Sequence, residues 1–365
     1  MRRSFGTLDG LRGTAAIVVL ILHAATATTP DHPLFASAYL AVDLFFLLSG
    51  FVIGYAYDAK LLNGLGFRRF LQIRIIRLYP LYLLGLMLGV LTPLVLAMMT
   101  QNWWLAKSTA LSLPWSVFML PRPTSDPVAW FSINPPAWSL FYEMIGNILY
   151  GLLISRLSNR TLMCIAAVAA VVLTAMSMHY GTINAHPNWQ IWSLTCLARM
   201  SFSFGLGLLF YRWWREGMLP APKLPAGLAI LLFLTLIAIP ASGVAAGALT
   251  AAVVLVGFPL VVIIGIANEP SPRAAPAMFE LGRMSYALYV LHWPIMMALV
   301  TLAPGLGVSP WMVSVLTVLI SLAAAWYAVR WFDEPVRAWL ARGTTRRPRA
   351  AGGGQGSATT VGLPR

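Results

Sequence analysis

The sequence contains ten long apolar runs, each close to the length that a helix needs to cross a lipid bilayer. A membrane-spanning helix takes about 20 mostly apolar residues, so ten of them leave only short connections in a chain of 365 residues. The runs cover residues 11–28, 38–57, 76–99, 137–154, 161–178, 192–211, 226–240, 244–266, 284–303 and 310–330. Only 10% of the residues are charged, against about 25% in an average soluble protein. This composition excludes a soluble enzyme held by a membrane anchor and predicts an all-α integral membrane protein.

The basic residues are distributed very unevenly between the two sides of such a bundle. If the chain starts in the cytoplasm, 22 of its 25 Lys and Arg residues lie at cytoplasmic ends of the runs. Of the other three, Lys107 and Arg122 lie outside and Arg199 lies within a run. Cytoplasmic ends of membrane helices carry such an excess. We therefore predict a bundle of about ten transmembrane helices with both termini cytoplasmic. The net charge of +14 follows from this topology and does not indicate a nucleic-acid partner.

The chain divides into a transmembrane domain and a short tail. We assign residues 1–342 to the transmembrane domain and residues 343–365 to a basic cytoplasmic tail, whose Gly-, Thr-, Arg- and Pro-rich composition predicts disorder. The one long outer segment, about 100–136, holds several Trp and Pro residues. Its residues 105–120 are expected either to dip into the bilayer or to form a lid.

Several small residues within the runs predict close helix packing. Glycines spaced four residues apart let helix backbones approach each other. Such pairs are Gly50 with Gly54 and Gly85 with Gly89. The two cysteines, Cys164 and Cys196, both lie in apolar runs, and we interpret them as small buried residues without a disulfide or a metal site.

Polar residues within the runs are the candidates for function, because burying them in a membrane costs free energy. Arg12 and His23 stand eleven positions apart in the first run. Eleven residues at about 100° each return to within about 20° of the starting direction and rise about 16 Å. Both side chains therefore share one helix face, with Arg12 near the cytoplasm and His23 deep in the membrane. His23 is then either a general base or a core histidine with satisfied hydrogen bonds.

Two carboxylates lie at a depth similar to that of His23. Asp43 is expected to hold the imidazole of His23 in one tautomer and to stabilise the imidazolium, or else to be a structural acceptor. Glu143 falls in the same layer, and Arg199 is its expected partner. The alternative for Glu143 and Arg199 is a buried ion pair that only fixes helix packing.

Further side chains align with this layer and are candidates for binding an acceptor. They are Trp138, Tyr142, Arg199, Tyr289 and His292. His292 either faces the same cavity as His23 or caps the break that Pro294 makes in its helix.

A cluster of arginines marks the cytoplasmic start of the third run. Arg74 and Arg77 lie one helical turn apart, and two guanidinium groups on one face suit a phosphate-rich ligand. Part of this charge also serves the topology. With Arg12 they would form a cationic inner mouth below the polar layer. A carrier with an anionic head and a long reactive arm fits such a path, since the arm would bring a thioester to His23.

These motifs resemble those of acyltransferase family 3, a family of integral-membrane acyltransferases. The resemblance covers roughly residues 5–340 and rests on five blocks in order. They are LDGLRGTAAIVVLILHA, VDLFFLLSGF, RIIRLYP, PPAWSLFYE and SYALYVLHWP. The first block holds the Arg-x10-His spacing of Arg12 and His23, and the third holds the Arg-x-x-Arg pattern of Arg74 and Arg77.

The resemblance implies an O-acyltransferase in the bacterial cytoplasmic (inner) membrane. It implies transfer of an acyl group, often acetyl, from cytoplasmic acyl-CoA to a hydroxyl of a carbohydrate, a surface glycan or a glycosylated small molecule. His23 is then the catalytic residue, Arg74 and Arg77 lie on the donor side, and no metal is needed. Acyl transfer directly to the acceptor and transfer through an acyl-histidine remain alternatives. The need for a partner protein and homo-oligomerisation are also left open.

Two other classes of protein fit the same residues. Intramembrane His, Asp and Glu also serve proton relays, which describes a proton-coupled exporter of a glycan or small molecule, although the chain lacks the repeated halves of many transporters. A structural scaffold of the envelope is the third interpretation.

Overall fold

The computed structural model of the protein describes residues 5–28, 35–125, 130–184, 188–239 and 245–345. Within these ranges all regular secondary structure is helical. Every apolar run of the sequence coincides with a helix. The bounds are α1 Gly6–Thr28, α2 Ala41–Leu62, α3 Phe67–Thr100, α4 Trp104–Val117, α5 Ala137–Leu153, α6 Asn159–Tyr180, α7 Trp189–Arg215, α8 Ala226–Ala238, α9 Ala245–Ala252, α10 Phe258–Ala267, α11 Ala275–Leu302, α12 Pro310–Tyr327 and α13 Glu334–Thr345.

Eight helical segments of the described chain are long and apolar enough to cross a membrane. The helix α8 has 13 residues and α5 has 17, and both are shorter than these eight. Short helical turns join several elements: η1 (Ala36–Leu40) leads into α2, the π-helical turn η3 (Val253–Gly257) joins α9 to α10, and the π-helical turn η5 (Ala328–Asp333) joins α12 to α13. The prediction of an all-α membrane bundle is confirmed.

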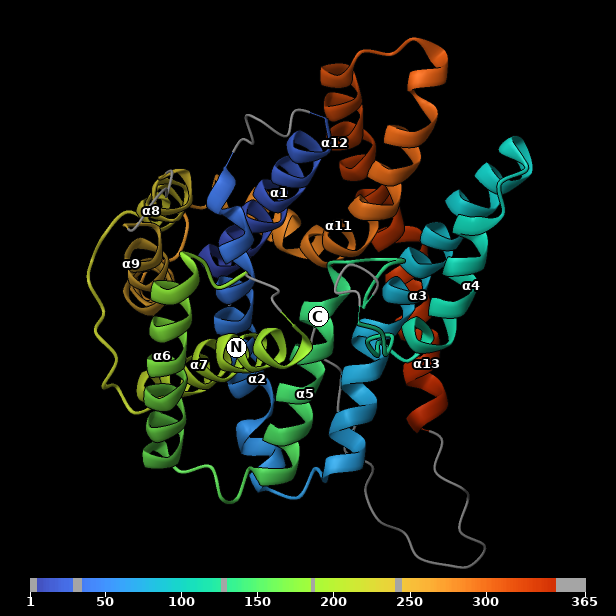
Figure 1. Ribbon diagram of the computed structural model, residues 1–365. Coiled ribbons are helices and arrows are strands. Elements are labelled where there is room, and N and C mark those ends of the chain that lie inside the picture. Colours follow the sequence, from blue (N-terminus) through green and yellow to red (C-terminus); the bar gives the residue numbers. More distant parts are fainter. Residues whose placement is uncertain (1–4, 29–34, 126–129, 185–187, 240–244, 346–365) are drawn as a thin grey trace, which may run out of the picture.

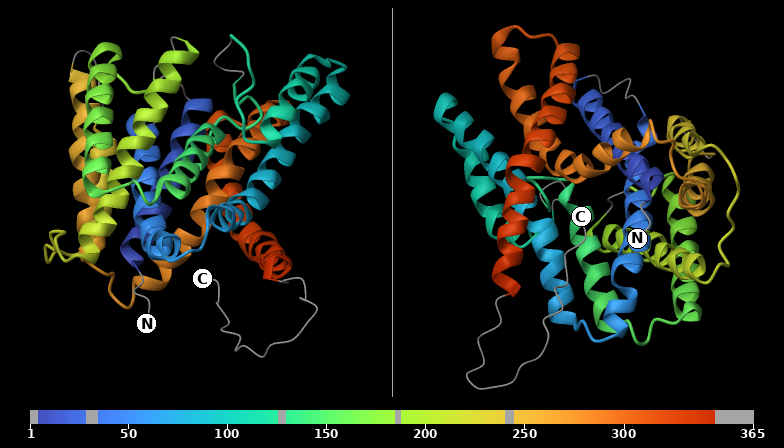
Figure 2. Two further views of the ribbon diagram at one scale, coloured as in Figure 1. Left: turned by 90° about the horizontal axis from the view of Figure 1, so that it is seen from below. Right: turned by 180° about the vertical axis from the view of Figure 1, so that it is seen from behind.

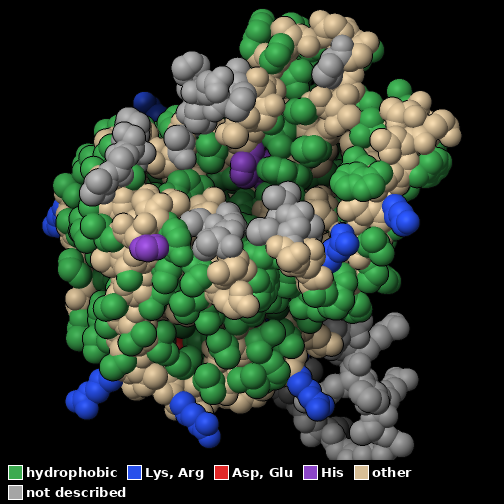
Figure 3. Space-filling view, viewed as in Figure 1, with side chains coloured by type: hydrophobic (Ala, Val, Ile, Leu, Met, Phe, Trp, Pro, Cys, Tyr) green, Lys and Arg blue, Asp and Glu red, His purple; other side chains and the backbone are tan. Residues whose placement is uncertain are grey.

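The helix α1 lies in the middle of the bundle (Figure 1). It packs against α11 and α12 on one side and contacts α2, α8 and α10 on the other. The helix α2 in turn packs along α7, and α6 covers α7 and α9. The first turns of α1 and the helix α13 lie on the same side of the bundle (Figure 2, left). Hydrophobic side chains are spread over the face in Figure 3, and most of its Lys and Arg side chains lie toward the edges of the view, chiefly the lower edge.

The predicted glycine packing is confirmed. A Cβ on Gly50 would overlap the carbonyl oxygen of Phe204 in α7, and one on Gly207 of α7 would overlap the carbonyl oxygen of Leu47 in α2. Gly85 meets the backbone of α11 in the same way, and Gly89 meets the backbone of Ile133. The α2–α7 interface is therefore held at backbone contact distance.

Replacing Gly50 by alanine is expected to lower the free energy of unfolding by about 1–3 kcal/mol, the usual cost of overpacking a tight interface. The matched control is Gly205→Ala in α7, because a Cβ at Gly205 meets no atom within 4 Å and alanine favours the helix. Thermal unfolding of the two purified variants checks the prediction. Equal midpoints for both would contradict it.

The outer segment returns into the bundle. The helix α4 runs back along α3, because the hydroxyls of Tyr79 and Tyr82 in α3 donate to the backbone oxygens of Val117 and Ser116 at the end of α4. Tyr82 stands 18 residues before the end of α3, a helical rise of about 27 Å. The end of α4 therefore reaches deep beside α3, as expected for the alternative in which this segment dips into the bilayer.

Two expectations from the sequence need adjustment. Cys196 is buried as predicted, whereas Cys164 is exposed, because α6 lies at the edge of the bundle and Cys164 is on its outer face. The helix α13 continues to Thr345, three residues beyond the predicted boundary at 342. The rest of the predicted tail, residues 346–365, lies outside the described residues.

Candidate active site

The helices α1 and α11 bring two histidines into direct contact. The Nδ1 atom of His23 lies 2.9 Å from the Nε2 atom of His292, and the two rings are parallel with centroids 5.1 Å apart. The Nδ1 atom of His292 lies 3.0 Å from the carbonyl oxygen of Leu288, one turn earlier in α11. The side chain of Trp293 lies edge-on against the ring of His23. The structure thus places His292 against His23.

The contacts of the pair define its tautomers. A carbonyl oxygen only accepts hydrogen bonds, so Nδ1 of His292 carries the proton that it donates to Leu288. In the neutral ring, Nε2 of His292 is then an acceptor, and Nδ1 of His23 must donate to it. The remaining nitrogen of His23, Nε2, consequently holds a free lone pair. His292 is fully buried, whereas His23 is partly exposed, so the basic nitrogen belongs to the accessible ring.

Another residue performs the capping that Pro294 requires. Proline lacks the N–H that would reach the carbonyl four residues earlier, which here is that of Val290. The side chain of Asn134 donates to this oxygen at 2.9 Å. Sequence reasoning missed Asn134, although a lone Asn before two prolines at the end of an outer segment was a signal.

Arg12 lies on the same face of α1 as His23, as predicted. Its Nε donates to Ser285 of α11 at 3.0 Å, and its Nη2 donates both to Asp9 and to the backbone oxygen of Gly282 at 2.9 Å. Both Arg12 and His23 therefore face α11, one near each end of the shared interface.

Asp43 does not orient His23, which corrects the pairing expected from the sequence. Its carboxylate accepts hydrogen bonds from Nε and Nη2 of Arg199 at 2.8–3.2 Å. Arg199 also donates to the backbone oxygen of Tyr39, and its guanidinium lies 5.0 Å from the ring centroid of Trp138. Arg199 and Asp43 are 0% and 1% exposed. A buried guanidinium requires a carboxylate, and the tight packing of α2 on α7 directs Asp43 to α7 rather than to α1.

Glu143 likewise has a partner other than the expected Arg199. Its Oε1 accepts from Nη2 of Arg74 at 3.1 Å and from the hydroxyl of Ser49 at 2.8 Å. This carboxylate therefore joins α5 to α3 and α2. Arg74 is nearly buried by the contact.

Arg74 and Arg77 thus have different partners, in contrast to the single grip expected of them. Arg74 binds Glu143 inside the bundle, whereas Nη1 of Arg77 lies 3.5 Å from Asp333 at the end of η5. The Nη2 atom of Arg337 in α13 lies 2.6 Å from the same carboxylate oxygen. Sequence reasoning missed Asp333 and Arg337. The signal was an acidic residue at the end of the last apolar run.

The predicted acceptor-binding aromatics are largely packed inside the bundle. The hydroxyl of Tyr289 lies 2.7 Å from that of Ser139 and donates to the backbone oxygen of Pro136. Trp138 and Tyr142 pack edge-on against Trp192, with ring centroids 5.9 and 6.0 Å away. Trp138, Tyr142 and Trp192 therefore form an aromatic wall beside the Asp43–Arg199 pair.

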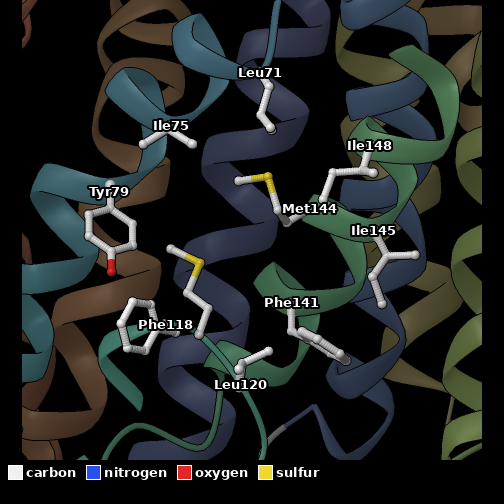
Figure 4. Close-up of a pocket in the computed structure, with 10 residues that line it drawn as sticks. Leu71, Ile75, Tyr79, Phe118, Leu120, Phe141, Met144, Ile145 and Ile148 are labelled. Carbon is white, nitrogen blue, oxygen red and sulfur yellow. The ribbon is translucent and has the colours of Figure 1, made fainter. Parts of the chain in front are cut away.

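A separate apolar cavity of about 370 Å³ lies between α3 and α5 (Figure 4). Its lining is Leu71, Ile75, Tyr79, Phe118, Met119, Leu120, Phe141, Met144, Ile145 and Ile148. The predicted site residues do not line it, although Ile75 and Met144 are the sequence neighbours of the ion-paired Arg74 and Glu143. Among the described residues, no group of three or more His, Cys, Asp or Glu side chains could hold a metal ion.

The fold defines an integral membrane protein built from helices. The chain belongs to acyltransferase family 3, because the acyltransferase domain of that family matches residues 5–330. It is thus a multi-pass membrane acyltransferase, and the exporter and scaffold interpretations fall away.

Two curated relatives support this assignment. The chain is 35% identical over 202 residues to "Protein 2 in picA locus" of Rhizobium radiobacter, an alignment that covers 48% of this chain and 96% of that protein. It is 26% identical over 314 residues to the "Putative membrane-bound transacylase BcsY" of Komagataeibacter xylinus, covering 79% of this chain and 72% of that protein. No solved structure matches the chain significantly.

Proposed function

We propose that the protein transfers an acyl group, most simply acetyl, from cytoplasmic acyl-CoA to a hydroxyl of a carbohydrate or glycan, with His23 as the general base. The observation that carries this proposal is the hydrogen-bond chain from Leu288 through His292 to His23. It leaves the lone pair on Nε2 of His23, the more accessible imidazole of the pair. A neutral imidazole is suited to accept a proton near neutral pH.

In the proposed reaction, the acceptor hydroxyl gives its proton to Nε2 of His23 while its oxygen attacks the thioester carbonyl carbon. The tetrahedral intermediate then expels the CoA thiolate, which takes the proton back from Nε2. The Nδ1–H of the transient imidazolium stays bound to Nε2 of His292, so the ring keeps its orientation throughout. An acyl-histidine route uses the same lone pair as the nucleophile.

The arginines take distinct proposed roles. Arg12 and Arg77 hold the phosphates of the donor at the inner mouth. Because the proposed donor is cytoplasmic acyl-CoA, this mouth opens to the cytoplasm. Glu143 binds Arg74 in the middle of the bundle, so we assign Glu143 the role of positioning the guanidinium group of Arg74. The name of the transacylase relative and the family support an acyl donor. The cytoplasmic membrane follows, since acyl-CoA is supplied from the cytoplasm.

The function is tested with purified protein in liposomes. Supply of acetyl-CoA on the side of Arg77 is expected to release CoA thiol over many turnovers only when a hydroxyl acceptor is present. In cells, deletion of the gene is expected to remove an ester from surface glycans, detected by mass spectrometry. Unchanged esters together with no CoA release from any acyl-CoA would refute the proposal.

His292 has a positioning role that can be tested separately. The variant His292→Phe removes the acceptor for His23 and is expected to lower kcat by about 10- to 100-fold, since misplacing a catalytic group by about 1 Å costs on the order of 10²-fold. The variant His292→Gln restores an acceptor oxygen and should recover part of the loss. Equal kcat for both variants, measured by CoA release, would contradict the tautomer assignment.

A further inference from the structure

Two guanidinium groups from distant parts of the chain converge on one carboxylate at the inner side of the bundle. The Oδ2 atom of Asp333 lies 3.5 Å from Arg77 of α3 and 2.6 Å from Arg337 of α13. The side chain of Asp333 is 2% exposed, and its other oxygen is buried without a hydrogen-bond partner in the described structure. The single negative charge of this carboxylate does not neutralise two guanidinium groups, and the Nε atom of Arg337 is also buried without a partner.

A third arginine adds to this positive charge. Arg77 interacts electrostatically with both Arg12 and Arg337, so the three cations lie near one another. Two carboxylates, Asp9 and Asp333, bind them. The cluster therefore holds one positive charge in excess. Its three arginine side chains are each about one-third to one-quarter exposed, so an anion from solution can reach them.

The neighbouring arginines on this side are already neutralised. Arg330 binds Glu280 at 2.6 Å, and Arg283 binds both Glu280 and Glu334. The helix α13 continues directly from η5, so Asp333 and Arg337 lie one turn apart on one continuous helical segment. The excess positive charge and the unpartnered Nε of Arg337 thus both point to one anion site.

We propose that Arg337, together with Arg77 and Arg12, binds a phosphate group of the acyl donor, and that Asp333 holds the two guanidinium groups until phosphate takes its place. This inference rests on the proposed function, which supplies a phosphate-bearing nucleotide donor. It makes α13 part of the donor site. Arg337 lies beyond the residues 5–330 that match the family. Guanidinium groups bind phosphate through paired, charge-assisted hydrogen bonds, which a carboxylate in the same place imitates.

The test measures the Kd of CoA, the unacylated donor, for the purified full-length protein. The variant Arg337→Gln is expected to weaken CoA binding by about 10- to 100-fold, the loss typical of a hydrogen bond between charged groups. The matched control is Arg330→Gln, which removes the same charge from a neighbouring turn but from an arginine already bound to Glu280. It should bind CoA like the wild type.

Two further measurements separate phosphate binding from a structural role. Pantetheine, which carries the arm of CoA without its phosphates, should bind equally to wild type and Arg337→Gln. The variant Asp333→Asn removes the competing charge and should bind CoA more tightly. Weaker binding by Asp333→Asn, or an equal loss for pantetheine and CoA in Arg337→Gln, would overturn the inference.

The outcomes also distinguish this inference from the proposed function. If the wild-type protein binds CoA and Arg337→Gln binds it equally well, only the phosphate site at Arg337 is refuted. If the wild-type protein does not bind CoA, the proposed donor itself is refuted, and the inference falls with it.

Discussion

Replacing His23 by glutamine is expected to lower the rate of acyl transfer by about a thousandfold, because a positioned general base contributes about 10²–10⁴ to a rate. Glutamine keeps a polar group of similar size beside His292 but has no nitrogen that accepts a proton near neutral pH. The binding of CoA should not change, since Arg12, Arg77 and Arg337 are untouched. The measurements are CoA release with acceptor present and the Kd of CoA.

The chain offers a matched control for this variant. His179 is exposed at the end of α6, remote from α11 in the packing of the helices. The variant His179→Gln should transfer acyl groups at the wild-type rate. Wild-type turnover by a folded His23→Gln protein would eliminate His23 as the base, and the hydrogen-bond chain through His292 would then have only a structural meaning.

Comparison of the wild type with His23→Gln also distinguishes direct acyl transfer from transfer through an acyl-histidine. An acyl-histidine intermediate predicts one labelled acyl group per wild-type molecule when acetyl-CoA is supplied without acceptor, and none on His23→Gln. Direct transfer predicts no bound label on either protein. Mass spectrometry of the intact proteins reads both results.

The sequence predicted the helices better than it predicted which polar side chains pair with one another. Hydropathy and length define each run, and the eleven-residue spacing correctly placed Arg12 and His23 on one face, which contacts α11. The length of a helix and the face on which its residues lie are properties of a single helix. The face depends only on the helical period of 3.6 residues.

The pairings of the carboxylates could not be derived in the same way. Depth in the membrane follows from position along a helix, and it put Asp43, Glu143 and His23 in one layer. Partner choice also requires the order of helices in the bundle and the rotation of each helix about its axis. Gly50 and Gly207 allow the close contact of α2 with α7, and this contact places Asp43 beside Arg199. The site at Asp333 was missed for the same reason, since its three arginines come from α1, α3 and α13.

Removing one partner of the Asp43–Arg199 pair is expected to cost about 3–5 kcal/mol of folding free energy, because the other charge remains buried without compensation. Both Asp43→Asn and Arg199→Gln should show this loss. The double variant has no unpaired charge and should lose much less than the sum of the two single variants. Unfolding midpoints of the four purified proteins form a complete double-mutant cycle.

A half-exposed ion pair of the same chain provides the comparison. Glu334 binds Arg283 at the edge of the bundle, where the two side chains are 45% and 23% exposed. The variant Glu334→Gln should cost less than about 1 kcal/mol, since exposed pairs contribute little. If Asp43→Asn is instead as stable as the wild type but inactive, Asp43 belongs to the chemistry of the site and not to the frame that supports it. A loss of stability that the double variant largely reverses would establish that Asp43 and Arg199 stabilise the contact of α2 with α7 as a pair.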